Sequence, residues 1–113
     1  MATAASKLAP FDYTLESDAE AQQKTVFKLR PLNAFEYMQA ADISGSRSRS
    51  ESCHYVLKTA LLGWTHFIDD AGADVEFSKK QIDNLERLTI MQVNELTAKV
   101  LEVSALDETE RKN

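Results

Sequence analysis

The chain has 113 residues, of which 43% are hydrophobic and 27% charged, and its formal net charge is −5. This length accommodates one domain with a single core, and the composition is that of a folded globular protein rather than a disordered or membrane-spanning one. The acidic balance disfavours a protein that grips a phosphate backbone, and a single cysteine excludes an intrachain disulfide or a zinc site built from several cysteines.

The first 23 residues show no sustained hydrophobic period, so we expect a flexible N-terminal arm over residues 1–23. Within it, Phe11, Tyr13 and Leu15 alternate with polar residues, which is typical either of a short strand or of an arm that docks on the body. The opening residues lack the pattern of a signal peptide, and no later stretch approaches the roughly 18 apolar residues of a membrane span. We therefore expect a cytoplasmic protein with no membrane partner.

Residues 24–106 are predicted to form a helical domain. Its first segment, KTVFKLRPL, favours a short β-strand that Pro31 ends, because proline lacks a backbone donor. Asn33 and Glu36 then have the spacing of a helix capping box. This pair predicts a helix over residues 34–43.

Residues 44–50, SGSRSRS, are rich in serine and predict a mobile loop, in which Ser50 can cap the next helix. From Cys53 to Trp64, apolar residues recur every three or four positions, which is the stripe of an amphipathic helix. Gly63 is well placed to end this helix.

Two further capping boxes follow in the sequence: Ser78 with Gln81, and Thr89 with Gln92. They predict a helix that runs to Leu88 and another over residues 90–105, before an acidic tail at 107–113 that should fray. Several amphipathic helices in so short a chain must bury their stripes against one another. The predicted fold is mainly α: a small single-domain helical bundle with minor short β-strand or hairpin elements.

The most acidic stretch, GWTHFIDDAGADVEFS, invites a calcium-loop interpretation, and a small calcium-responsive module is one alternative function. Counted from Asp69, however, the ligand positions three and five hold Ala71 and Ala73, and position six holds Asp74 in place of the required glycine. The sequence favours a turn with Gly72 in a left-handed conformation and no metal.

No catalytic motif is present. Three glycines are too few for a phosphate-binding loop, and His54 and His66 lack the spacing of a zinc site. Cys53 and His54 are neighbours on a predicted helix and therefore point in different directions. We expect a protein that is not an enzyme and needs no cofactor.

The SRSRS segment, with Lys24, Lys28 and Arg30, supports a second alternative, a nucleic-acid-associated accessory protein. Two arginines beside a net negative charge make a weak electrostatic footprint, so a solvated linker is favoured and no nucleic-acid partner is expected. A generic small helical adaptor between proteins is a third alternative.

The order of segments resembles a known family. TVFKLRPLNAFEYMQAADI, a helix ending LLGW, then FIDDAGADVEF, and a last helix leading into LEVSALDETERKN are similar to the tail assembly chaperones of long-tailed bacteriophages. The similarity covers roughly residues 24–113. Its motifs are structural rather than catalytic.

This resemblance implies a non-enzymatic chaperone in the bacterial host cytoplasm, absent from the mature virion. Its partners would be the long helical tape measure protein and the tail tube protein, with homo-oligomers also possible. Family members often have a longer form made by ribosomal frameshifting, and Lys112 and Asn113 are compatible with the slippery codons AAA AAC. Such a chaperone would cover an apolar helix that aggregates when exposed.

Candidate partner-binding residues are Trp64, Phe67 and Phe77, because aromatic side chains in an incompletely covered groove can bind a partner helix. The competing interpretation places all three in the core, since a small domain needs large apolar side chains there.

Overall fold

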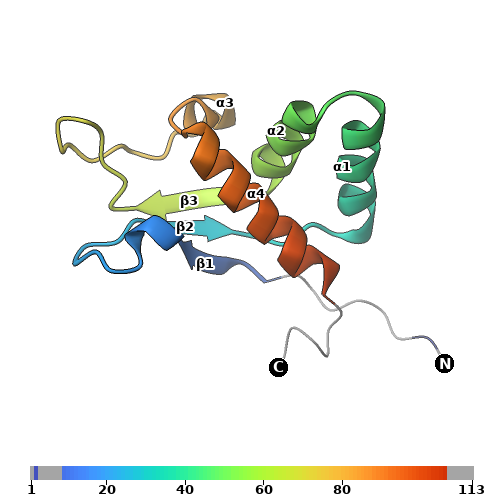
Figure 1. The fold of residues 1–113 in the computed structure, drawn as a ribbon, viewed down its shortest axis with the longest axis horizontal. Helices are drawn as coiled ribbons and strands as arrows, with labels where there is room; N and C mark the ends of the chain where they lie inside the picture. The colour runs from blue at the N-terminus through green and yellow to red at the C-terminus, as the bar shows by residue number, and fades with distance from the viewer. Residues whose placement is uncertain (1, 3–8, 107–113) are drawn as a thin grey trace.

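Three short strands form an antiparallel sheet in the order β1-β2-β3, with β1 at Phe11–Thr14, β2 at Val26–Leu29 and β3 at Leu61–Thr65. The computed structural model describes residues 2 and 9–106 (Figure 1). The predicted acidic tail, the Lys112–Asn113 pair and part of the predicted N-terminal arm lie outside these residues. Within the described part of the arm, β1 is a strand of the sheet and a 3-10 helix follows at Glu16–Asp18.

The strands alternate between a buried and a solvated face. Phe27 and Leu29 of β2 are fully buried, whereas Lys28 between them is exposed. Phe27 lies opposite Tyr13 on one side and Trp64 on the other. Residues directly opposite in a sheet share a face, so this register places the aromatic side chains of all three strands beside the core.

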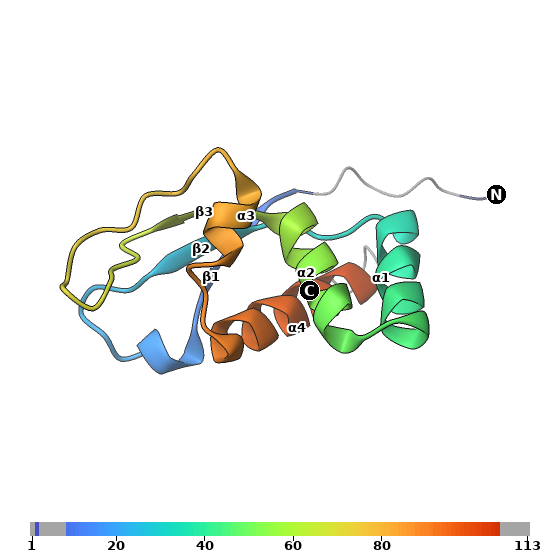
Figure 2. The ribbon, with the colours of Figure 1, turned by 90° about the horizontal axis from the view of Figure 1, so that it is seen from above.

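Four α-helices accompany the sheet in the described chain: α1 at Ala34–Ser46, α2 at Arg49–Ala60, α3 at Gln81–Leu85 and α4 at Ile90–Ala105. α1 and α2 are inserted between β2 and β3, and α2 packs against both α1 and α4. α4 lies on one side of the sheet (Figure 2). Its Leu96 and Val100 join Phe27 and Leu29 in the core.

The expected mainly α bundle is wrong, because the protein is an α+β fold in which the sheet supplies part of the core. The apolar period continues from Cys53 to Trp64, but α2 ends at Ala60 and the next five residues form β3. Gly63 therefore lies inside a strand and does not end a helix. Pairing with β2, which is distant in sequence, overrides the local helical period here.

Residues 44–50 do not form the expected loop. α1 continues to Ser46, and α2 begins at Arg49 with Ser48, rather than Ser50, as its N-cap. The Ser48 hydroxyl oxygen accepts a hydrogen bond from the Glu51 N–H at 3.1 Å, which satisfies a donor in the first turn. Two residues thus connect two helices.

Two of the predicted capping boxes are confirmed, one at Asn33 and Glu36 and one at Thr89 and Gln92. The helix predicted after Ser78 is shorter than expected, because α3 spans only Gln81–Leu85. Ser78 instead accepts a hydrogen bond from the Lys80 N–H at 3.0 Å.

Candidate functional site

The three aromatic residues predicted to bind a partner meet in one cluster around the segment between β3 and α3. The Trp64 ring lies 4.8 Å from the rings of both Phe67 and Phe77, and Phe67 lies 5.4 Å from Phe27 of β2, each pair edge to face. This arrangement sets the positive edge of one ring against the negative face of the next. The cluster therefore ties the segment after β3 to the sheet.

Polar contacts hold the two arms of this segment together. Trp64 donates its indole N–H to the Val75 carbonyl at 2.7 Å, and the Val75 N–H donates to the Phe67 carbonyl at 2.7 Å. Ile68 and Asp74 form an isolated antiparallel bridge farther out. The acidic stretch is thus a narrow, hairpin-like loop, here called the aromatic hairpin (residues 64–77).

The tip of the aromatic hairpin is a tight turn. Gly72 has φ 81°, which confirms the left-handed conformation predicted for it. Asp69 Oδ1 accepts hydrogen bonds from the N–H groups of Ala71 and Ala73, at 2.9 and 3.0 Å. The side chain of Asp69 thus stabilises the turn itself. In the described chain no group of three or more His, Cys, Asp or Glu side chains is placed to hold a metal ion.

The aromatic cluster contributes mainly to the core. Phe67 is only 8% exposed, and Trp64 and Phe77 are half-buried against the buried cluster. Only parts of Trp64 and Phe77 are therefore accessible to another molecule, and a partner-binding role for the three residues stays a prediction.

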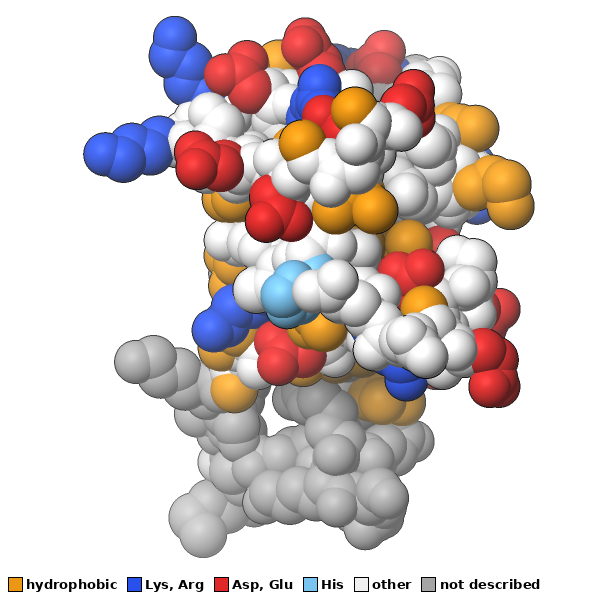
Figure 3. Space-filling model, turned by 90° about the vertical axis from the view of Figure 1, so that its left-hand side faces the viewer, with side chains coloured by type: hydrophobic (Ala, Val, Ile, Leu, Met, Phe, Trp, Pro, Cys, Tyr) orange, Lys and Arg blue, Asp and Glu red, His pale blue; other side chains and the backbone are white. Residues whose placement is uncertain are grey.

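An open pocket of about 650 Å³ lies between the aromatic hairpin and the junction of α3 with α4. Its lining combines apolar side chains with charged ones: Phe67, Ile68, Val75, Asp69, Asp70, Glu86 and Arg87. Figure 3 shows the end of the molecule that carries the loops, where acidic side chains are spread among hydrophobic ones. The described part of this face is mixed in character, with a few basic side chains lying apart from one another.

Two exposed residues near this pocket were missed from the sequence. Ile90 and Met91 begin α4 and are 71% and 78% exposed. A signal was available for Met91, which does not fit the steps of three and four that join Val93, Leu96 and Val100, but not for Ile90, which stands three residues before Val93 and fits them. Large apolar residues in that position are candidates for contact with another protein.

The histidines and the cysteine do not form a catalytic group. Cys53 is buried, whereas its neighbour His54 is exposed. His66 has φ 56°, and its Nδ1 lies 3.0 Å from Gln23 Nε2 while its carbonyl accepts a hydrogen bond from the Thr25 hydroxyl at 2.8 Å. These contacts join the end of β3 to the segment before β2.

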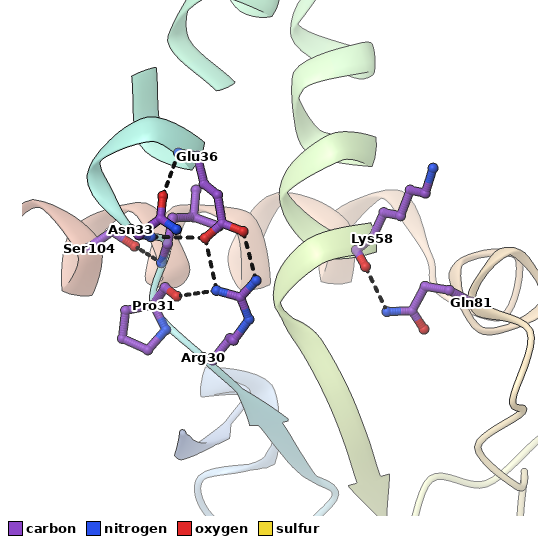
Figure 4. A network of polar contacts seen from close by, with 8 residues as sticks. Arg30, Pro31, Asn33, Glu36, Lys58, Gln81 and Ser104 are labelled. Atoms are coloured by element: carbon purple, nitrogen blue, oxygen red, sulfur yellow. Dashed lines mark hydrogen bonds and ion pairs between the residues drawn. The ribbon is translucent and has the colours of Figure 1, made fainter. Parts of the chain in front are cut away.

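Arg30, one of the basic residues that support the nucleic-acid alternative, forms an ion pair within the chain. Its two terminal nitrogens donate to the two carboxylate oxygens of Glu36 at 2.9 and 2.8 Å (Figure 4). The hydrogen bond from Arg30 is the main cause that lowers the pKa of Glu36, and the Asn33 N–H adds to it. The other basic residues of that alternative, Lys24, Lys28, Arg47 and Arg49, are exposed, and Arg47 pairs with Glu51 at 3.6 Å.

A second polar cluster secures the junction between α2 and β3. Gln81 donates its amide to the Leu61 carbonyl at 2.7 Å and to the carbonyls of Leu57 and Lys58 at 3.2 Å each (Figure 4 shows the Lys58 contact). Leu57 and Lys58 belong to the last turn of α2, where the Leu57 carbonyl also accepts from the Leu61 N–H, and Leu61 is the first residue of β3. The Gln81 side chain thus joins the end of α2 to the start of β3, while the Ala60 carbonyl accepts from the Arg30 N–H at 3.0 Å.

Comparisons with protein families, with curated proteins and with solved structures find no match to this chain. Among residues 2 and 9–106, no helix has the length and apolar character needed to cross a membrane.

Proposed function

We propose that this protein is a non-enzymatic phage tail assembly chaperone that acts by binding another protein. The observation that carries the protein-binding part is the set of large hydrophobic side chains that the described chain leaves exposed: Phe35, Tyr37, Met38, Leu62, Ile68, Ile82, Ile90 and Met91. Exposed apolar side chains that are neighbours on the surface are candidates for contact with another protein, and Phe35 and Met38 stand three residues apart on α1. The phage part comes from the resemblance in segment order described above.

In this proposal the partner is the tape measure protein, and the chaperone also helps to recruit tail tube subunits. A long helix with an apolar stripe aggregates while it waits for the tube to polymerise. A chaperone that covers the stripe with its own apolar surface would prevent this, because the helix would bury the same area without self-association. The site of action would be the bacterial host cytoplasm, and the chaperone would be lost from the mature virion.

Co-expression tests the proposal directly. The tape measure protein encoded near this chain should move from the pellet to the supernatant when the chain is co-expressed, and it should co-purify with it. An unrelated acidic protein of similar size, expressed at the same level, is the control. If the neighbouring gene encodes no long helical protein, or if its product stays in the pellet, the phage assignment is wrong.

A further inference from the structure

The pocket between the aromatic hairpin and the junction of α3 with α4 has an apolar lining on its hairpin side, made by Phe67, Ile68 and Val75. Phe67 and Val75 also pack in the core, whereas Ile68 is 56% exposed. The side chain of Ile68 is therefore open to another molecule. The volume of about 650 Å³ lies in the range of ligand-binding clefts.

The same pocket is lined by three carboxylates, Asp69, Asp70 and Glu86, and by one guanidinium, that of Arg87. None of these four groups forms an ion pair within the described chain. Asp69 Oδ1 holds the turn of the hairpin, whereas Asp70 and Glu86 are exposed. The lining thus has an excess of negative charge that the chain itself does not neutralise.

The charge around the pocket has the same sign. Residues 64–77 include four acidic residues and neither lysine nor arginine. The end of the molecule drawn in Figure 3 shows acidic side chains beside hydrophobic ones, and the whole chain has a formal net charge of −5. Charge complementarity therefore favours a cationic partner, and it disfavours an acidic segment or a second copy of this chain.

We propose that this pocket binds a basic segment of another protein. That segment places a large aliphatic or aromatic side chain against Ile68 and sets lysines or arginines against Asp70 and Glu86. The apolar contact buries surface that the fold leaves exposed, and the carboxylates select the charge of the partner. The inference rests on the proposed protein-binding function but not on the assignment to phage tails.

Three synthetic peptides test the two features separately. The probe is a fluorescein-labelled peptide of about 14 residues, with Leu at every third or fourth position and Lys at most others. One control peptide has Ser in place of Leu, and the other has Glu in place of Lys. Fluorescence anisotropy at low salt should show binding of the probe and at least about tenfold weaker binding of either control. Added salt should weaken binding of the probe, because it screens exposed charges.

Matched double variants locate the charge contact. Asp70→Asn with Glu86→Gln removes two charges from the lining, whereas Asp12→Asn with Asp42→Asn removes two charges from exposed positions outside the pocket. The first pair should weaken binding of the probe at least about fivefold, and the second by less than about twofold. Asp70→Lys with Glu86→Lys should reverse the preference, so that the Glu peptide binds more tightly than the probe.

A second pair of variants tests the apolar contact. Ile68→Thr keeps a β-branched side chain but shortens the apolar surface in the pocket, and it should weaken binding at least about threefold. Ile82→Thr is the control, because Ile82 is 52% exposed and does not line the pocket. Binding should stay unchanged in this variant. Far-UV circular dichroism verifies that each variant is folded.

Several outcomes overturn the proposal: no binding of the probe by wild type up to about 1 mM peptide, equal binding of all three peptides, or equal losses in the pocket and control double variants. A wild-type dimer that Ile68→Thr converts to a monomer would place a second copy in the pocket and would also overturn it. A pocket that binds the probe while co-expression fails would remove the phage assignment alone. Successful co-expression that Asp70→Lys with Glu86→Lys leaves intact would keep the chaperone and reject the pocket.

Discussion

Trp64 and Val75 face each other across the aromatic hairpin, joined by the 2.7 Å hydrogen bond from the indole N–H to the carbonyl oxygen. Eleven positions of sequence separate them, and the acidic turn around Gly72 lies between. The same indole ring packs edge to face on Phe67 and Phe77. One side chain therefore fixes both the closure of the hairpin and its attachment to the core.

Trp64→Phe should lower the free energy of unfolding by about 1–2 kcal/mol, because the Val75 carbonyl loses its donor and the smaller ring gives up part of the packing on Phe67 and Phe77. Chemical denaturation followed by far-UV circular dichroism measures this. Phe35→Leu, at a position that is 82% exposed, is the control and should change stability by less than about 0.5 kcal/mol. A Trp64→Phe variant as stable as wild type would show that the hydrogen bond is not important.

Gly72→Ala and Gly45→Ala should shift stability in opposite directions. An added Cβ meets nothing within 4 Å at either position, so only backbone conformation decides. At Gly72, with φ 81°, alanine is strained and should destabilise the fold by about 1 kcal/mol. At Gly45, inside α1, alanine should stabilise it by about 0.5–1 kcal/mol. If both variants shift the melting temperature by the same small amount, both expectations are wrong.

These local features were within reach of sequence reasoning because each depends on neighbouring residues alone. The capping boxes at Asn33 and Thr89 and the turn at Gly72 are confirmed. The fold class was not within reach: Leu61 and Trp64 fit a helical period, and only their pairing with Leu29 and Phe27 makes them a strand. Sequence distance hides such pairing, just as it hides the contact of the Gln81 side chain with the carbonyls at the end of α2.

The candidate site was predicted in part. The residues Trp64, Phe67 and Phe77 do come together, but a sequence cannot tell how much of an aromatic cluster stays accessible. The pocket between the aromatic hairpin and the junction of α3 with α4 was not predicted. Its lining comes from two segments, residues 67–75 and 86–92, which face each other only in the folded chain.

Glu36→Gln should destabilise the protein at neutral pH and do so less at acidic pH. The hydrogen bond from Arg30 lowers the pKa of Glu36 below its ordinary value of 4.5. The carboxylate therefore stabilises the fold fully at pH values above 4.5, and this contribution is lost as the pH falls through the lowered pKa. At pH 7 the expected loss is about 1–2 kcal/mol, from the weakened cap and the broken ion pair. Thermal unfolding from pH 7 to pH 3 measures it.

Glu20→Gln is the matched control, because Glu20 is exposed and makes no ion pair in the described chain. Its melting temperature should differ little from that of the wild type at every pH. If Glu36→Gln and Glu20→Gln behave alike, the Arg30–Glu36 pair makes no net contribution.

Tyr13 should make the protein sensitive to alkaline pH. Burial, the 2.6 Å hydrogen bond to Glu95 and nearby carboxylates raise the pKa of Tyr13 from 10.0 to about 12. Above pH 10 the unfolded chain releases this proton while the folded chain keeps it, so stability falls as pH rises between about 10 and 12. Tyr13→Phe should reduce the dependence of the unfolding free energy on pH in this range. Urea unfolding at several pH values measures that dependence.

Tyr37→Phe serves as the comparison, since Tyr37 lies on the surface of α1 and makes no hydrogen bond to Glu95. It should retain the wild-type slope between pH 10 and 12. A Tyr13→Phe variant with an unchanged slope would place the alkaline sensitivity on another group.

The insertion of α1 and α2 between β2 and β3 also bears on how the chain folds in time. Contacts between α1 and α2 are close in sequence, whereas Phe27 can meet Trp64 only after the whole intervening segment has closed into a loop. Loop closure has an entropic cost that local helix contacts avoid. The helical pair is therefore expected to form early in refolding. The fluorescence of the single tryptophan, which lies on the last strand to join, would follow completion of the sheet.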